Sequence, residues 1–292
     1  MKKTNSVKGQ RSLIQRIALA PYSVWALLFI VVPLIFIAYY AFTDLDYHFT
    51  TENITRFFTT TSQVADGEGT REVRTYVLIF LRSLKLAVIS TAICLLMAYP
   101  FAFLLTKAKP RTQSILITLI MIPMWMNFLI RTYAWMTILQ DTGILNGLLG
   151  MLHLRKVHII GTESAVVIGM VYDYLPYMIL PLYSIMAKMD ERLIEAAYDL
   201  GCNGAGVFRR VIWPLSLPGV ISGVNMVLIP SVSTFYISQK LGGKMKLIGD
   251  EIEEKYTNFD FNGAAAIAFI MMILLLVVMA LLQHRANKRS VA

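Results

Sequence analysis

Between two long apolar segments the chain reads Asp190-Glu191-Arg192-Leu193-Ile194-Glu195-Ala196-Ala197-Tyr198-Asp199-Leu200-Gly201. Asp190 is a residue type that caps helix N-termini, and Gly201 is the type that most readily ends a helix. The small residues Ala196 and Ala197 let another surface approach the backbone closely. Glu195 and Asp199, four residues apart, leave a charged edge. The stretch therefore predicts a short helix that docks on another protein.

The segments on both sides of this helix are long enough to cross a membrane. The 292 residues are 57% hydrophobic and 15% charged, which is more apolar than a soluble chain requires. Runs that reach the roughly 20 residues of a spanning helix recur near 22–42, 82–105, 114–139, 164–187, 215–236 and 263–283. The first run is too long for the core of a cleaved signal peptide, so we expect it to be retained. The predicted fold is an all-α integral membrane protein with about six transmembrane helices.

The distribution of basic residues predicts the orientation. With the N-terminus inside, the inner segments are rich in Lys and Arg, whereas many Asp and Glu dilute the basic residues of the outer segments. We expect 1–21 to be a cytoplasmic arm, 22–283 the membrane domain with a cytoplasmic loop at 188–214, and 284–292 a cytoplasmic tail. Because the net charge of +9 is spread over loops, nucleic acid is not an expected partner.

The predicted spans differ in polarity. The third, fourth and fifth contain proline and polar groups, namely Pro123, Asn127, Arg131, Asp173, Pro176, Pro181, Pro218, Asn225, Pro230 and Ser231. Proline frees a backbone carbonyl that a neighbouring helix or a wet cavity must satisfy. We expect these three spans to line a pathway. The last span, 263–283, has no ionisable residue and is predicted to face lipid.

The loop resembles that of ABC import permeases, whose pattern is Glu-Ala-Ala, three residues, Gly, nine residues and Ile-x-Leu-Pro. This chain has Glu195-Ala196-Ala197, Gly201 and, nine residues later, Val211-Ile212-Trp213-Pro214. The resemblance implies a type I ABC importer permease fold in which this loop is a coupling helix seated in the ATPase. It assigns coupling to Glu195, Ala196, Ala197, Asp199, Gly201 and Pro214. A loop helix lying on the membrane is the alternative.

No Gly-x-x-x-x-Gly-Lys-Ser/Thr pattern for nucleotide binding occurs in the chain. We therefore expect a permease subunit that is not itself an enzyme and has no cofactor or metal of its own, with ATP and Mg bound by a partner. The resemblance implies three protein partners: a homodimeric ATPase, a second homologous permease and an extracytoplasmic solute-binding protein. It also implies that the chain lies in the lipid of a bacterial cytoplasmic membrane.

Two charged residues fall away from the ends of predicted spans, where an ionisable group is costly. Arg131 and Asp173 lie in oppositely directed helices and at similar depth, so they can pair with each other. Alternatively, Asp173 meets a cationic substrate beside Tyr177 and Tyr172, or Arg131 meets an anionic one. The residues alone leave the sign of the substrate open.

Aromatic side chains accompany these charges, including Trp125, Trp135 and Tyr236. Asn127, Arg131 and Trp135 are spaced at i, i+4 and i+8, which predicts one shared face turned to the interior. Tyr and Trp are also common at membrane interfaces, so packing or interface positions are the alternative for most of them.

Three further stretches resemble the spermidine/putrescine permeases, specifically the first of their two permease subunits. They are 127–135, 175–184, and 241–244 with 247–249, within a likeness that runs from about Ser83 to the end. Asp250 stands where this resemblance leads us to expect Asn. The resemblance implies inward polyamine transport by alternating access, with a polyamine-binding receptor outside the membrane.

Two other functions stay open at this point. One is an importer of the same build for sulfate, phosphate, iron or a sugar. The other is a proton-coupled carrier or membrane enzyme, which needs a relay or catalytic cluster within the spans. Beyond Arg131 and Asp173, with Arg82 and Lys85 near an outer edge, the sequence shows no such cluster.

Overall fold

The computed structural model describes residues 20–44, 46–66 and 69–290, so nearly all of the predicted arm 1–21 lies outside the described residues. Within these ranges, five helical segments are long and apolar enough to cross a membrane. The five segments are Ala20–Ala41, Thr75–Lys107, Glu163–Met186, Gly204–Ser233 and Phe261–Leu281. The first contains η1 (Leu27–Val31) and α2 (Val32–Ala41), the second is α4 (Thr75–Lys107) and the third is α8 (Glu163–Met186). The fourth contains α10 (Gly204–Val207), η2 (Phe208–Ile212) and α11 (Trp213–Ser233), and the fifth belongs to α14 (Phe261–Ser290). A bent pair of helices forms a sixth candidate.

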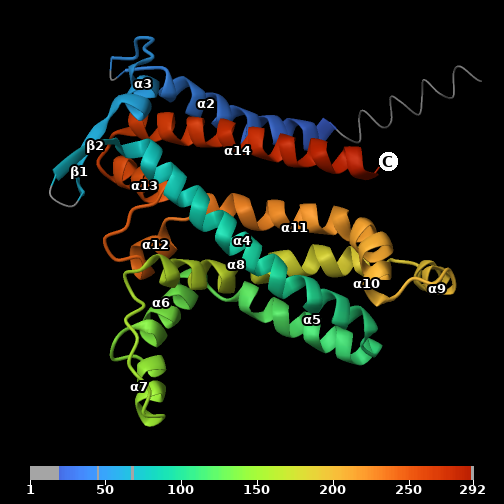
Figure 1. Ribbon diagram of the computed structural model, residues 1–292. Coiled ribbons are helices and arrows are strands. Elements are labelled where there is room, and N and C mark those ends of the chain that lie inside the picture. The colour runs from blue at the N-terminus through green and yellow to red at the C-terminus, as the bar shows by residue number, and fades with distance from the viewer. Residues whose placement is uncertain (1–19, 45, 67–68, 291–292) are drawn as a thin grey trace, which may run out of the picture.

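The long helices run side by side across Figure 1, and the shorter elements gather at their two ends. At one end, termed the α9 end, lie α9 (Glu191–Asp199), the turn between α4 and α5 (Pro110–Trp125), and the C-terminal end of α14. At the other, termed the α13 end, lie α3 (Glu52–Thr59), β1 (Thr61–Asp66), β2 (Gly69–Arg74), α6 (Phe128–Leu139), α7 (Ile144–Met151), α12 (Tyr236–Leu241) and α13 (Ile248–Thr257).

Helices α4, α8 and α11 form the centre of the bundle. Their buried side chains include Leu86, Met170, Met178 and Val227. Gly223 of α11 lies directly on α8, because a Cβ at this position would be 2.6 Å from the Met178 sulfur. Between membrane helices, small residues of this kind permit the close backbone approach that drives association.

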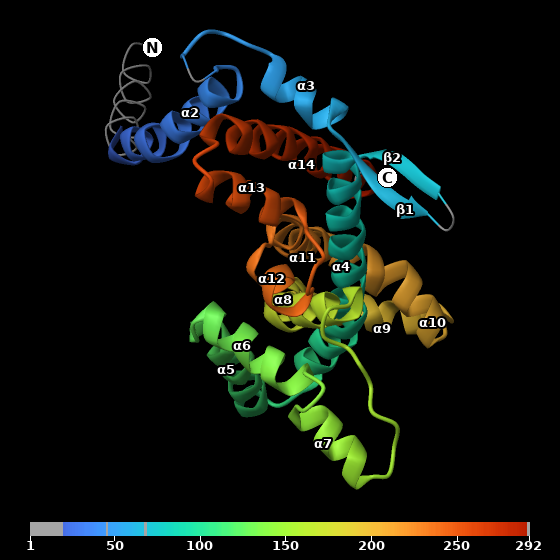
Figure 2. The same cartoon turned by 90° about the vertical axis from the view of Figure 1, so that its left-hand side faces the viewer.

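Helix α14 packs along α2, as Figures 1 and 2 both show. Near the α13 end, the buried Asn262 donates its side-chain N–H groups to the carbonyl oxygens of Thr43 and Asp44. The Phe42 and Phe269 rings meet edge to face at 5.5 Å. One face of α14 is therefore used for packing, while Leu276 and Val277 remain exposed, as expected of a helix against lipid.

The predicted third span, 114–139, differs from the structure. It is not one helix but α5 followed by α6, and α6 together with α7 is bent by 94° from α5. Met126 and Asn127 adopt extended backbone at the break. Pro123 weakens the last turn of α5, and the Asn127 side chain accepts the N–H of Leu129 at 2.8 Å, which starts a new helix.

The segment between the first two spans contains the second departure from the prediction. β1 and β2 pair antiparallel with Thr61 opposite Arg74, so the all-α description applies to the spanning bundle and not to this two-stranded segment. Helix α4 begins at Thr75, seven residues before the predicted 82, because its first turns continue beyond the bundle centre and pack Ile79 beside Phe57.

Helix α4 also binds the elements that follow α11. The hydroxyl of Ser83 accepts the backbone N–H of Ile248, the first residue of α13, at 2.8 Å. Both residues are fully buried. This hydrogen bond fixes the start of α13 to α4.

Candidate coupling helix and translocation pathway

Helix α9 forms where the sequence predicts it. The Asp190 carboxylate accepts the N–H of Arg192 at 3.0 Å and caps the first turn. At the other terminus Gly201 has φ +81°, a left-handed conformation that side chains with a Cβ rarely adopt. The chain then turns back to α10, whose first turn is capped by Asn203.

Two contacts join α9 to the bundle. Ala197 packs with Val207 and Ile212 in a small apolar cluster. Lys107, the last residue of α4, donates to the Glu191 carboxylate at 2.7 Å, and this hydrogen bond lowers the pKa of Glu191. Helix α9 is therefore attached both to the turn that leads into α11 and to the end of α4.

The remaining surface of α9 is exposed. Glu195, Ala196 and Asp199 are exposed on it, and Leu200 beside them is 85% exposed. The structure corrects one sequence interpretation, because Ala197 faces its own chain and not an external surface: at this helical position it meets Val207. Pro214 is exposed in the first turn of α11, next to the loop.

The two intramembrane charges meet. Arg131 Nη1 of α6 lies 3.3 Å from Asp173 Oδ1 of α8, and both side chains are buried, at 7% and 2% exposed. The distance defines an ion pair, yet neither atom makes a hydrogen bond of good geometry within the described residues. The guanidinium also lies 5.8 Å from the centre of the Phe128 ring.

Two tyrosines of α8 lie on its exposed side, close to this pair in the sequence. Tyr172 is exposed and meets the Trp135 ring of α6 edge to face at 5.2 Å. Tyr177 is exposed as well and lies near Tyr174, whose hydroxyl donates to the Pro230 carbonyl of α11 at 3.3 Å. Asp173 is thus flanked along α8 by two open tyrosine rings.

Tyr236 belongs to a second aromatic group, at the start of α12. Its ring lies 6.0 Å from Phe128 and 6.1 Å from Tyr133 of α6. The Lys240 ammonium lies 5.4 Å from the Tyr133 ring centre and 5.5 Å from that of Tyr236. Figure 2, which looks onto the α13 end, shows α6, α8 and α12 together there.

Two of the sequence-predicted pathway residues do not join these groups. Trp125, at the end of α5, is 78% exposed on this chain. Asn127 is exposed and uses its side chain to cap α6, so it does not share a helical face with Arg131 and Trp135. The i, i+4, i+8 argument is wrong for Asn127 because the helix begins after it.

Two contacts near the candidate sites are not predicted by the sequence analysis. The contact of Lys240 with Tyr133 depends on α12 folding back onto α6. The pairing of Lys107 with Glu191 joins residues 84 positions apart. The spacing of Tyr236 and Lys240, four residues apart on one helix, indicates that the lysine lies near an aromatic ring. No sequence pattern indicates the pairing of Lys107 with Glu191.

Comparisons with known proteins agree along most of the chain. The family model of the binding-protein-dependent transport system inner membrane component matches residues 75–291. The Spermidine/putrescine transport system permease protein PotB of Haemophilus influenzae is 37% identical over 287 residues, 94% of each chain. PotB of Escherichia coli is 38% identical over 216 residues, covering 73% of this chain and 78% of the relative.

The fold has a solved counterpart. A chain in the crystal structure of a bacterial alginate ABC transporter in complex with an alginate-bound periplasmic protein superposes with a TM-score of 0.76 over 99% of both chains. The two sequences are 14% identical, so this likeness concerns the fold alone.

Proposed function

The chain belongs to the family of binding-protein-dependent transport system inner membrane components, and on this premise we propose that it is a permease subunit of an ABC importer that carries polyamines into the cell. The relatives that support the cargo are spermidine/putrescine permeases of similar length. Transport proceeds by alternating access, in which the pathway opens to one side of the membrane at a time.

The observation that carries the proposal is helix α9. It is capped at both ends, attached to α4 and to the start of α11, and presents Glu195, Ala196 and Asp199 on a free surface. A helix with these contacts can act as a coupling helix. A separate, homodimeric ATPase moves it when the ATPase binds ATP and Mg. Gly201 lets the chain reverse direction after it, and Pro214 starts the helix that receives the motion.

The α9 end is then the cytoplasmic side, with both chain termini, and the α13 end faces outward in a bacterial cytoplasmic membrane. Lys107, Lys109, Arg111, Lys188, Arg209 and Arg210 give the α9 end the positive charge typical of inner loops. A solute-binding protein delivers cargo at the α13 end. A second, homologous permease covers the exposed aromatic side of α6 and α8, and lipid surrounds the pair.

The cargo passes along the side of α8 that carries Asp173. A polyamine has ammonium groups on an alkyl chain, which suit tyrosine rings and a carboxylate. Tyr172, Tyr177, Trp135 and Tyr236 supply rings near the ion pair. In the resting pair Arg131 neutralises Asp173, and we propose that a cargo ammonium replaces the guanidinium during passage. Trp125 contributes only from the edge of this surface.

Uptake into vesicles tests the cargo. The complete transporter, with both permeases and the ATPase, is reconstituted with its receptor, and labelled spermidine, putrescine and sulfate are offered with and without ATP. We expect ATP-dependent uptake of the polyamines. Uptake of sulfate alone supports the rival importer of the same build, and ATP-independent uptake driven by a proton gradient supports a carrier.

A further inference from the structure

Two tyrosines and a lysine meet at the α13 end, where α12 folds against α6. Tyr133 comes from α6, whereas Tyr236 and Lys240 lie one turn apart on α12. The two rings meet edge to face, with their centres 6.1 Å apart. The Lys240 ammonium lies 5.4 Å from the Tyr133 ring centre and 5.5 Å from that of Tyr236. We term Tyr133 and Tyr236 the tyrosine site.

The rings are the partners of the Lys240 charge. Lys240 forms no ion pair with a carboxylate among residues 20–44, 46–66 and 69–290. The negative face of an aromatic ring attracts a cation that lies within about 6 Å of the ring centre, and both distances fall within this range. The tyrosine site thus already holds a primary ammonium on an alkyl chain.

The tyrosine site can be reached from outside the chain. Tyr133 is 45% exposed, and Tyr236 and Lys240 are half-buried. Lys240 carries its ammonium on a flexible stem, so the charge can leave the rings by rotation of the side chain alone. The place that it leaves is then open to another ammonium.

Phe128 joins the tyrosine site to the buried ion pair. Its ring centre lies 6.0 Å from that of Tyr236, and the Arg131 guanidinium lies 5.8 Å from it on α6. Arg131 in turn pairs with Asp173. Along this series of contacts the order is a cation site, an apolar ring and a carboxylate. A polyamine has the matching order of ammonium, alkyl chain and ammonium.

We propose that the tyrosine site binds one primary ammonium group of an aliphatic polyamine, and that this group takes the place of the Lys240 ammonium. The inference rests on the proposed function, because it gives the cargo of that function a place at the α13 end. A cation–π contact at an accessible site is weak, and here it replaces one already present. Cargo bound in this way is released readily for onward movement. Lys240 therefore determines how tightly the site holds cargo.

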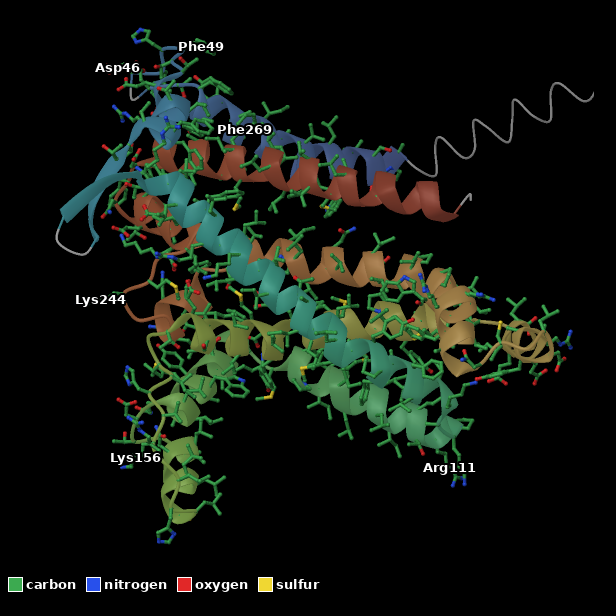
Figure 3. All side chains as sticks on the ribbon, in the orientation of Figure 1. Asp46, Phe49, Arg111, Lys156, Lys244 and Phe269 are labelled. Carbon is green, nitrogen blue, oxygen red and sulfur yellow. The ribbon has the colours of Figure 1, made fainter. Side chains whose placement is uncertain are left out.

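The first test is binding of putrescine to the assembled transporter in nanodiscs, read from the concentration dependence of its thermal stabilisation. Lys240→Ala removes the competing ammonium and is expected to raise affinity about fivefold. Lys244→Ala is the matched control. Figure 3 shows Lys244 at the same end of the molecule, opposite Arg111, and Lys244 is exposed and lies over no ring among the described residues. This variant is expected to change affinity by less than about twofold.

A series of fluorinated rings in place of Tyr133 tests the cation–π contact itself. Tyr133→Phe keeps the ring, and phenylalanines with increasing numbers of fluorine atoms then withdraw negative charge from its face. In the Lys240→Ala background, putrescine affinity is expected to fall along the series, by about threefold in all. With Lys240 present the series is expected to be flat, because each fluorine weakens the contact of the departing lysine as much as that of the arriving cargo.

The proposal is overturned if Lys240→Ala and Lys244→Ala bind putrescine equally well, or if the fluorinated series is flat in the Lys240→Ala background. It is also overturned if the neutral analogue 1,4-butanediol stabilises the transporter as putrescine does.

Vesicle uptake separates a cargo site from a contact with the receptor. A cargo site predicts that Lys240→Ala lowers kcat, because cargo leaves the rings more slowly, while KM for the loaded receptor is unchanged. A raised KM with unchanged kcat makes Lys240 a receptor contact and overturns the proposal. Absence of polyamine uptake by the wild type overturns the proposed function itself. Wild-type uptake together with unaltered putrescine affinity in Lys240→Ala overturns only the tyrosine site.

Discussion

Arg131 and Asp173 approach to 3.3 Å across the contact of α6 and α8, buried from solvent and without a well-formed hydrogen bond between them. A buried ion pair of this kind gains little over an apolar contact, while the loss of one partner leaves an uncompensated charge. A structural pair and the proposed role in transport therefore predict different effects of changing one partner.

A charge exchange between these two residues separates the roles. Asp173→Asn leaves Arg131 unpaired and is expected to cost about 3 to 5 kcal/mol in stability along with most of the uptake. The double variant Arg131→Asp with Asp173→Arg restores the pair and the melting temperature. It does not restore polyamine uptake, because the acid has moved to α6. Recovery of both quantities argues that the pair is purely structural.

Charge reversal on the exposed face of α9 is expected to uncouple the transporter. Glu195→Lys leaves membrane insertion and the fold intact, because the side chain is exposed, but reduces transport at least tenfold by disturbing the ATPase contact. Lys188→Glu, an exposed reversal just before α9, is the control and retains transport. Normal uptake by Glu195→Lys, with the ATPase still copurifying, contradicts the coupling role.

Gly201→Asp is expected to impair coupling by a different route. A residue with a Cβ at φ +81° costs about 1 to 2 kcal/mol, although no atom lies within 4 Å of the added Cβ. The end of α9 is therefore displaced without a clash. ATP hydrolysis by the complex that no longer responds to the loaded receptor is the expected readout. A receptor-stimulated rate equal to the wild type contradicts this.

Asp250 makes stability depend on pH. Burial raises its pKa to about 6 from an ordinary value of 3.8, an effect that the Leu247 hydrogen bond only partly offsets. Because the folded-state pKa is the higher one, protonation favours the folded protein, and this contribution is lost as pH rises through about 6. Relative to acidic pH, the loss at pH 7.5 amounts to about 2 to 3 kcal/mol.

The comparison of Asp250→Asn with the wild type measures this effect. The variant is expected to melt a few degrees higher at pH 7.5 and to show a smaller difference at pH 4.5, where only part of the loss has occurred. Melting curves of the purified complex at both pH values provide the data. Parallel pH profiles for the two proteins show that Asp250 is not the titrating group.

The close contact of α8 and α11 predicts a packing effect. In Gly223→Ala the new methyl group would lie 2.6 Å from the buried Met178 sulfur and 3.3 Å from the Met178 carbonyl oxygen. Overpacking of this kind costs about 1 to 3 kcal/mol. Gly150→Ala, where nothing lies within 4 Å, is the matched control. Equal melting temperatures for the two variants contradict the close approach.

The sequence predicts the parts of this fold that depend on local chemistry. The Asp190 cap and the Gly201 stop define α9 because both act on their own turn. The meeting of Arg131 with Asp173 follows from similar depth in neighbouring spans. These features need no knowledge of how distant segments pack.

Other features depend on packing between distant segments and escape the sequence. The run 114–139 is mostly apolar along its length, so Pro123 signals a weak point but not a turn of 94° after Trp125. Lys240 meets Tyr133 only because α12 returns to α6. Ala197 faces inward because α10 and η2 fold beneath α9, which composition does not indicate.

Helix α4 connects the two ends of the bundle. From Ser83 to Lys107 it is one helix, about 36 Å long at 1.5 Å per residue. Ser83, eight residues after the start of α4, is bonded to Ile248, and Lys107, its last residue, is bonded to Glu191. A continuous helix bonded at both places transmits a displacement at one to the other, although Pro100 removes one of its backbone hydrogen bonds. In the proposed importer, a displacement that the ATPase imposes on α9 therefore reaches the start of α13 through this single helix.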